Sequence, residues 1–291
     1  MTVCDLRDEM TPTTKANEIL MQAMVDERFY LLVEGATDFK LFNRILPVEA
    51  WEVEFLDGKH NVAKCMQDLV LQGANRVSAV LDSDPLDPCI SEGQVFYSQL
   101  ADLDADLFAI EGLIDRIVTS NAQVRDQTVL AQIGQPTWRD VVIGLVEPWT
   151  AARLHLSVSA PGVSMKEFPV HLLGDAQTAK LRSVELNRLV ENKGGRGYLE
   201  SVDVKDLVHE KGSKELELFH NGHHIASALA WVLSEVLKAN KLRANTVEDF
   251  ARTAITLEEI RRLRVVVEFH AWAHAQSTCI WPAGSCDQLT G

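Results

Sequence analysis

Residues 28–40 read Arg28-Phe29-Tyr30-Leu31-Leu32-Val33-Glu34-Gly35-Ala36-Thr37-Asp38-Phe39-Lys40. The five apolar residues from Phe29 to Val33 are rich in aromatic and branched side chains, which is typical of a short strand buried on both faces of a parallel sheet. Glu34 stands at the carboxyl end of that strand, and Thr37 and Asp38 fit the cap and first turn of a following helix. Because ligands of open α/β sheets bind at this edge, Glu34 is the first candidate ligand.

A second apolar segment, residues 76–81, runs straight into Asp82-Ser83-Asp84-Pro85. Carboxylates two residues apart at a strand end can both turn toward one ion, and the proline stops the strand. If this strand is a parallel neighbour of the first one, Glu34, Asp82 and Asp84 converge at one edge of the sheet. Such a cluster repels itself unless a cation neutralises it, and hard oxygen ligands select Mg²⁺ or Mn²⁺.

Two further segments extend the pattern. Residues 51–56 alternate apolar and polar side chains, as a strand with one open face near the sheet edge does. Residues 57–61 then form a turn into a helix over 61–71; Lys59 either meets a phosphate there or belongs to an ordinary strand-to-helix turn. Residues 106–110 again predict a short apolar strand, which ends at Glu111. The alternative for Glu111 is a residue that opens a helix and favours its dipole.

Taken together, these segments resemble the OLD-like branch of TOPRIM domains, the metal-binding fold of topoisomerases, primases and OLD-type nucleases. More narrowly, they resemble the stand-alone TOPRIM effectors of bacterial anti-phage systems such as PARIS. The resemblance covers roughly residues 25–120, and it rests on residues 30–40, 57–62 and 81–84. It implies an α/β fold with a TOPRIM-like, mostly parallel sheet flanked by helices. It also favours a functional role for Gly58 and Lys59, and a fourth ligand at Glu111.

The chemistry expected of this cluster is metal-dependent hydrolysis of a phosphodiester bond. The side chains expected to hold Mg²⁺, or Mn²⁺, as two ions are Glu34, Asp38, Asp82, Asp84 and Glu111. Among them Glu34, Asp82 and Asp84 are the catalytic candidates, together with Lys59. No tyrosine in this half is placed for a covalent topoisomerase step, and no zinc ribbon or long primase scaffold is present, which favours an endonuclease.

The resemblance implies an RNA substrate, in particular tRNA, and a toxic activity in antiviral abortive infection that an ABC-type ATPase partner restrains. OLD nucleases that act on DNA carry a similar set of motifs, so DNA stays the alternative substrate. The sequence has no Walker A motif, so an ATPase must be another polypeptide. Two other classes remain open: a regulatory module that binds Mg²⁺ without catalysis, and a phosphohydrolase that acts on a nucleotide.

Composition sets limits on these interpretations. The 291 residues are 46% hydrophobic, which is ample for a buried core. There is no run of eighteen apolar residues and no apolar N-terminal signal segment, so we expect a cytoplasmic protein without membrane contact. Five widely spaced cysteines are interpreted as free thiols. The net charge of −14 indicates that any nucleic acid is bound by a local basic patch or is delivered with the help of a partner.

Residues 121–291 are expected to be mainly helical, with helices near 137–156, 179–190, 225–237 and 257–275. Pro148 should end or kink the first of these. The predicted organisation is a lead-in helix in 1–24, a catalytic domain in 25–120 and a helical domain in 121–291 for substrate, partner or homodimer contacts. The glycine-rich loop at 192–197 suggests a phosphate-binding patch with Lys193, Arg196 and Lys205, although a plain flexible loop is the simpler interpretation.

Histidines are candidate metal ligands as well. His220 and His224 would suit zinc if they shared a helix face, but the sequence offers no convincing third ligand, and a helix-start turn is favoured. Packing is favoured for His270 and His274 in the last helix.

Overall fold

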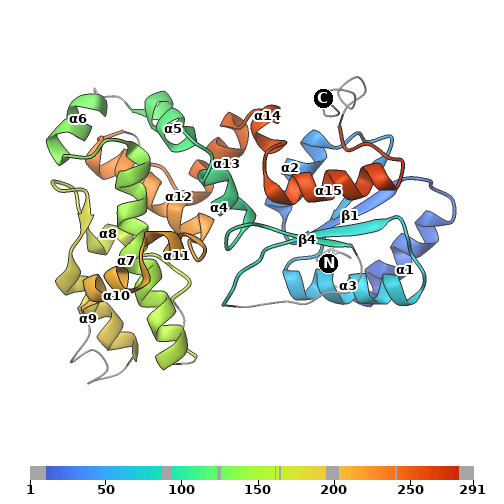
Figure 1. Ribbon diagram of the computed structural model, residues 1–291, viewed down its shortest axis with the longest axis horizontal. Coiled ribbons are helices and arrows are strands. Elements are labelled where there is room, and N and C mark those ends of the chain that lie inside the picture. Colours follow the sequence, from blue (N-terminus) through green and yellow to red (C-terminus); the bar gives the residue numbers. More distant parts are fainter. Residues whose placement is uncertain are drawn as a thin grey trace, which may run out of the picture. The chain divides into compact units, whose positions relative to one another are not determined.

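The computed structural model describes residues 11–86, 94–122, 126–160, 162–163, 165–194, 203–239 and 241–281. The chain divides into two compact units (Figure 1). The sheet unit comprises Met1–Ser83, Asp87–Gln99 and Leu257–Gly291. The helical unit comprises Asp84–Leu86 and Leu100–Thr256.

The sheet unit contains four parallel strands in the order β2-β1-β3-β4 within its described residues. The strands are β1 (Phe29–Val33), β2 (Trp51–Phe55), β3 (Val77–Leu81) and β4 (Val95–Tyr97). Tyr30 to Val33 are at most 1% exposed, which confirms a central strand buried on both faces. β2 lies at an edge, as its alternating pattern predicts. The expected class, an α/β fold with a parallel sheet flanked by helices, is confirmed.

Helices cover both faces of this sheet (Figure 1). α1 (Pro12–Ala23) and α3 (Lys59–Leu71) pack on the face that carries Tyr30 and Leu32. On the opposite face, Phe42 of α2 (Ala36–Ile45) contacts the ring of Phe269 in α15 (Arg264–Ala275). Phe269 also contacts the rings of Trp51 and Phe96, so α15 closes the core on this side.

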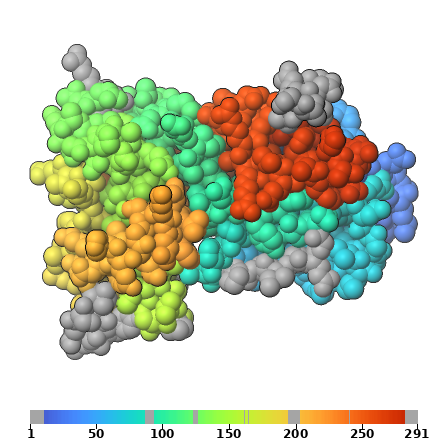
Figure 2. All heavy atoms as spheres, viewed as in Figure 1, coloured from blue at the N-terminus to red at the C-terminus, as the bar shows by residue number. Residues whose placement is uncertain are grey.

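The position of α15 changes the expected division of the chain. The sequence suggests one helical domain over 121–291, whereas residues 257–281 pack with the sheet. α14 (Leu257–Ile260) precedes α15. Together the two helices form a continuous surface of the sheet unit in the space-filling view (Figure 2). Burial of aromatic rings against the strands gives the physical reason, because such rings bury about 150–250 Å² each.

The strand predicted over residues 106–110 is wrong. These residues lie in and just after α4 (Leu103–Phe108), which continues through a turn into α5 (Leu113–Asn121). Asp102 caps α4 by accepting a hydrogen bond of 2.7 Å from the Ala105 amide, and Asp106 accepts one of 2.7 Å from the Leu100 amide. These two carboxylates accept hydrogen bonds from backbone amides at the start of the helix. They stabilise the helix there by more than the four apolar residues 107–110 favour a strand.

The helical unit consists mostly of short helices around one long one. The elements after α5 are α6 (Asp126–Ile133), α7 (Trp138–Ser159), α8 (Val170–Leu173), the hairpin β5 (Gly174–Asp175) and β6 (Lys180–Leu181), α9 (Ser183–Gly194), α10 (Val204–Lys211), α11 (Ser213–Glu217), α12 (Gly222–Trp231) with a π-helical end at Val232–Val236, and α13 (Ala244–Ala254). The helices expected near 137–156 and 225–237 are present, and the last expected one is split into α14 and α15. The helix expected over 179–190 begins only at Ser183, because Lys180–Leu181 pair with β5 as strand β6. Pro148 does not end α7, because Leu145, Val146 and Trp149 around it are fully buried and hold the helix in place.

The cysteines differ from their interpretation as free thiols. Cys65 is free and buried, and burial raises the pKa of its thiol to about 12. Cys279 is disulfide-bonded, so the interpretation is wrong at that position. Cys4, Cys89 and Cys286 lie outside the described residues.

Candidate functional site

Glu34 and Asp82 meet at the carboxyl edge of the parallel sheet. β1 and β3 are hydrogen-bonded neighbours in which Val33 is opposite Val80, so the residues after each strand leave the sheet side by side. The Glu34 Oε1 atom accepts a hydrogen bond of 2.5 Å from the Asp82 amide. Both residues are half-buried. The Glu34 carboxylate therefore lies beside the Asp82 backbone, and convergence of the Glu34, Asp82 and Asp84 side chains stays a prediction.

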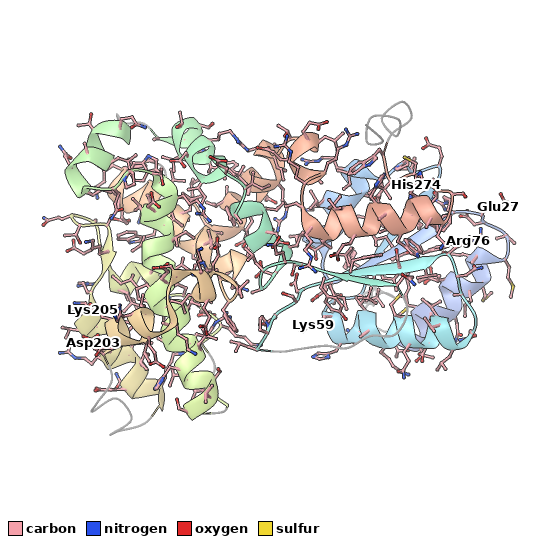
Figure 3. All side chains as sticks on the ribbon, in the orientation of Figure 1. Glu27, Lys59, Arg76, Asp203, Lys205 and His274 are labelled. Carbon is pink, nitrogen blue, oxygen red and sulfur yellow. The ribbon has the colours of Figure 1, made fainter. Side chains whose placement is uncertain are left out.

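The loop after β2 is tied to the same edge. Gly58 has φ +115°, a conformation that suits glycine, and its amide donates a hydrogen bond of 3.0 Å to the Glu34 carbonyl. Asn61 holds the loop by donating from its side chain to the carbonyls of Leu56 and Asp57, at 2.9 and 3.2 Å. Lys59, in the first turn of α3, is only 7% exposed. Figure 3 shows Lys59 at the end of the sheet unit opposite Glu27 and Arg76.

Asp38 has a local structural role in addition to its predicted one. α2 begins after Gly35, so Gly35 and not Thr37 is the N-cap residue. The Asp38 Oδ2 atom accepts a hydrogen bond of 3.3 Å from the Gly35 amide. This contact orients the backbone next to Glu34 and places a carboxylate in the first turn of α2, where the helix dipole favours it. Coordination of a metal by Asp38 stays a prediction.

Two of the predicted ligands belong to the helical unit. The Asp84 Oδ1 atom accepts a hydrogen bond of 3.0 Å from the Leu86 amide, and the Asp84 amide donates to the Ala101 carbonyl at 2.9 Å. Asp84 also faces a buried guanidinium: burial lowers the pKa of Arg153, and the charges of Asp84 and Asp102 oppose that shift. Glu111 is exposed in the turn between α4 and α5, not at the end of a strand.

The carboxylates of the sheet edge are predicted to hold a hard cation. In the parts of the chain that the structure describes, no group of three or more His, Cys, Asp or Glu side chains is arranged to hold a metal ion. Two carboxylates are nevertheless a normal protein contribution for Mg²⁺, which keeps several waters and takes its other ligands from substrate phosphates. Coordination of one ion by Glu34 and Asp82, and of a second ion, stays a prediction.

The histidines considered for zinc are packing residues. α12 begins at Gly222, and its N-cap Asn221 accepts from the His224 amide at 3.3 Å. The His224 Nε2 atom lies 2.8 Å from the Lys166 carbonyl. Burial lowers the pKa of both His220 and His224 to about 4, so both rings are neutral at pH 7. The helix-start interpretation of this segment is confirmed.

Sequence reasoning missed a buried acid beside these histidines. The Asp102 carboxylate accepts hydrogen bonds from the Gly222 amide at 2.9 Å and from the Asn221 side chain at 2.6 Å. Burial raises the pKa of Asp102 to about 6. The only sequence signal for Asp102 was its position directly before α4, where it could cap an apolar helix.

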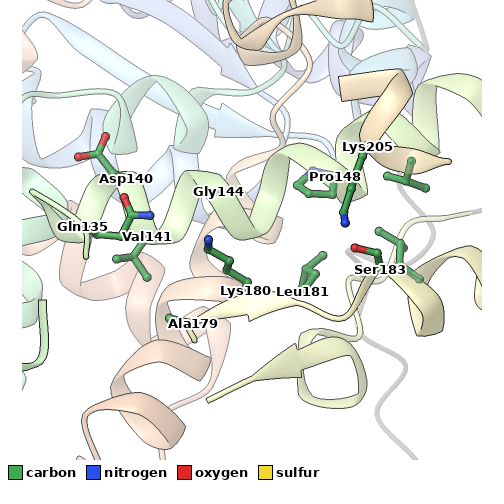
Figure 4. A pocket seen from close by; sticks show the side chains of 12 residues that line it. Gln135, Asp140, Val141, Gly144, Pro148, Ala179, Lys180, Leu181, Ser183 and Lys205 are labelled. Carbon is green, nitrogen blue, oxygen red and sulfur yellow. The ribbon is translucent and has the colours of Figure 1, made fainter. Parts of the chain in front are cut away.

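The predicted basic patch is only partly described. Lys193 is exposed near the end of α9, and Arg196 lies outside the described residues. Lys205, in the first turn of α10, lines a pocket of about 200 Å³ within the helical unit. Lys180 lines the same pocket, and sequence reasoning missed it because β6 is only two residues long (Figure 4).

A search for membrane-spanning helices and comparisons with known proteins add little to the geometry of these sites. Among the described residues, no helix combines the length and the apolar character that crossing a bilayer needs. No family model matches the chain, and no curated protein is similar enough in sequence to count as a relative. The function must therefore be argued from the chemistry of the sites.

Proposed function

We propose that this protein is a divalent-metal-dependent nuclease that hydrolyses phosphodiester bonds at the carboxyl edge of its parallel sheet. The observation that carries the proposal is the pairing of Glu34 with the Asp82 amide at the ends of two neighbouring strands. A carboxylate held by a backbone donor keeps one orientation, so its remaining lone pairs point in a constant direction. A metal site needs ligand atoms whose orientation is fixed in this way.

The residues of this edge have separate roles in the proposal. Glu34 and Asp82 hold the ion, and Asp38 keeps the Gly35 amide and the adjoining loop in place. Bound Mg²⁺ or Mn²⁺ supplies Lewis-acid stabilisation of the phosphoryl oxygens and a more acidic bound water. Lys59 supplies a positive charge from the loop tied to the Glu34 carbonyl through Gly58, where it attracts the phosphate group.

We assign RNA as the substrate, with tRNA as the first candidate, and toxicity in anti-phage defence as the biological setting. This part rests on the resemblance to stand-alone TOPRIM effectors. Delivery by a partner, such as an ABC-type ATPase, agrees with the net charge of −14, which disfavours unaided binding of a long polyanion.

The decisive experiment compares wild type with Glu34→Gln and with a matched control, Glu27→Gln. Glu27 is an exposed carboxylate near the opposite end of β1 (Figure 3). Purified proteins are incubated with labelled tRNA, with duplex DNA and with nucleoside triphosphates, in Mg²⁺, Mn²⁺ or EDTA. We expect discrete, metal-dependent tRNA fragments from wild type and Glu27→Gln and none from Glu34→Gln.

The other outcomes select among the remaining classes. Cleavage of DNA alone identifies a DNase, and release of phosphate from nucleotides identifies a phosphohydrolase. If wild type binds Mn²⁺ through Glu34 but cleaves nothing, including after release from a co-expressed ATPase, the sheet edge is a regulatory metal site. Equal cleavage by Glu34→Gln overturns the catalytic role of this edge.

A further inference from the structure

The pocket of the helical unit lies between elements that are far apart in the sequence. One wall is α7, and the other walls come from the β5–β6 hairpin and from the first turns of α9 and α10. Figure 4 shows Gln135 and Val141 at one end, Ser183 and Lys205 at the other, and Lys180 between them. The volume of this pocket is about 200 Å³.

Two lysines bring positive charge into this pocket. Neither Lys180 nor Lys205 makes a salt bridge to another residue of the described segments. The ammonium groups point into the space between α7 and the opposite wall (Figure 4). Together they create a site for an anion.

An acid that lines the pocket, Asp140, is already engaged. Its carboxylate accepts a hydrogen bond of 2.5 Å from the Thr137 hydroxyl at the start of α7, and Figure 4 shows it turned away from the lysines. Asp140 keeps its charge, but it makes no salt bridge with Lys180 or Lys205 in the described part of the chain.

The rest of the lining has an apolar floor and several polar groups. Val141, Pro148, Leu181 and Leu186 supply the apolar surface. Pro148 has no N–H, so the Gly144 carbonyl one turn earlier receives no helical hydrogen bond from it, and both residues line the pocket. The Gln135 amide and the Ser183 hydroxyl add polar groups at the two ends. A planar ligand with hydrogen-bonding edges and an attached anion matches this pattern.

We propose that this pocket binds one nucleotide, with its base on the apolar floor near Gln135 and its phosphate between Lys180 and Lys205. Inorganic phosphate alone would leave the apolar floor exposed, and a lipid would need a larger apolar volume. The nucleotide comes either from solution or from an unstacked position of a single strand. The second source rests on the proposed function, because it makes the pocket part of RNA recognition.

The test is calorimetric titration of the full chain with AMP, GMP, CMP and UMP and with a short single-stranded RNA, all in EDTA. The Glu34→Gln background is used throughout, so hydrolysis cannot interfere. We expect saturable binding, and about a hundredfold weaker binding by the double variant Lys180→Gln/Lys205→Gln, because each of the two lost charged contacts is worth about one order of magnitude. The matched control is Lys211→Gln/Lys214→Gln, which removes two charges of the same unit that do not line the pocket, and its affinity should change less than twofold.

A second variant keeps the inference testable if the charge changes disturb folding. Gln135→Leu retains both lysines, and we expect it to alter the preference among the four bases while inorganic phosphate competes as in wild type. Tighter binding of RNA than of any mononucleotide assigns the pocket to the substrate, and the reverse order assigns it to a free nucleotide. Absence of saturable binding by the Glu34→Gln protein with the pocket intact, or equal weakening in the control pair, overturns the inference. Neither result depends on whether the sheet edge cleaves RNA.

Discussion

The carboxylates of the sheet unit and the lysines of the helical unit reach their sites by different routes. In the sequence, Glu34 and Asp82 each come directly after an apolar strand. Parallel pairing of the strands brings their carboxyl ends to the same edge of the sheet. Lys180 and Lys205 are brought together by a two-residue strand and a helix start that share no local pattern. Strand-end sites are therefore visible in a sequence, whereas a pocket assembled by helix packing is not.

The largest effect is expected at Asp82, in contrast to Asp84, two positions later. Asp82→Asn should lower hydrolysis at least about a thousandfold and abolish Mn²⁺ binding, because one of the two carboxylates proposed to hold the ion is lost. Asp84→Asn should retain Mn²⁺ binding within about threefold and instead lower the melting temperature, since Asp84 faces the buried Arg153. Electron paramagnetic resonance of Mn²⁺ and thermal denaturation measure both. Loss of Mn²⁺ binding in Asp84→Asn alone would reverse this assignment.

The next effect concerns the sheet unit alone. Phe269 is fully buried and contacts the rings of Phe42, Trp51 and Phe96. Phe269→Ala should destabilise the sheet unit by about 4 kcal/mol through lost burial and a cavity. Hydrogen exchange measured by mass spectrometry should show faster exchange in β1 to β4 and unchanged exchange in α7 and α12. Faster exchange confined to the helical unit would show that α15 does not support the sheet.

The response to acid should be strongest in the helical unit. His220 and His224 have a folded-state pKa of about 4, below the unfolded value of about 6.5, so the stability they contribute is present above pH 6.5 and falls as pH drops toward 4. Each accounts for up to about 3 kcal/mol. Asp102, whose pKa is raised to about 6, has the opposite effect. It adds up to about 3 kcal/mol to the free energy of unfolding as the pH falls from 6 to 4. The net loss is about 3 kcal/mol.

Urea denaturation between pH 7 and pH 4 measures this loss. The comparison variant is His224→Gln, whose amide preserves the hydrogen bond to the Lys166 carbonyl without a titrating ring. We expect a shallower pH dependence in His224→Gln than in wild type. An identical slope in the two proteins would show that the ring of His224 is not the acid-sensitive group.

The smallest expected effect compares two glycines of the helical unit. A Cβ atom at Gly222 would lie 2.3 Å from Asp104 Cβ and 2.7 Å from the Ala105 amide nitrogen, so Gly222→Ala should cost about 2 to 3 kcal/mol. A Cβ atom at Gly144 would have no described atom outside its own helix backbone within 4 Å, so Gly144→Ala should stabilise α7 by about 0.5 to 1 kcal/mol. Chemical denaturation of both variants gives the comparison. Equal destabilisation would mean that the close contact at Gly222 relaxes freely.

Much of the sheet unit could be predicted from local patterns. The buried strand β1, the edge strand β2 and the strand-end positions of Glu34 and Asp82 follow from short apolar runs bounded by turn residues. β4 could not be predicted in this way, because its three residues become a strand only by pairing with β3. The same holds for Lys59, whose burial depends on the packing of α3.

The amino-acid sequence is sufficient to predict the class of the fold and the chemical character of one sheet edge. Both depend on periodicity and strand-end polarity, which are properties of neighbouring residues. Folding in three dimensions settles the rest. It joins α15 to the strands through aromatic contacts and brings Lys180 and Lys205 to one pocket. Each of these depends on contacts or hydrogen bonds whose free energy is not expressed in any single segment.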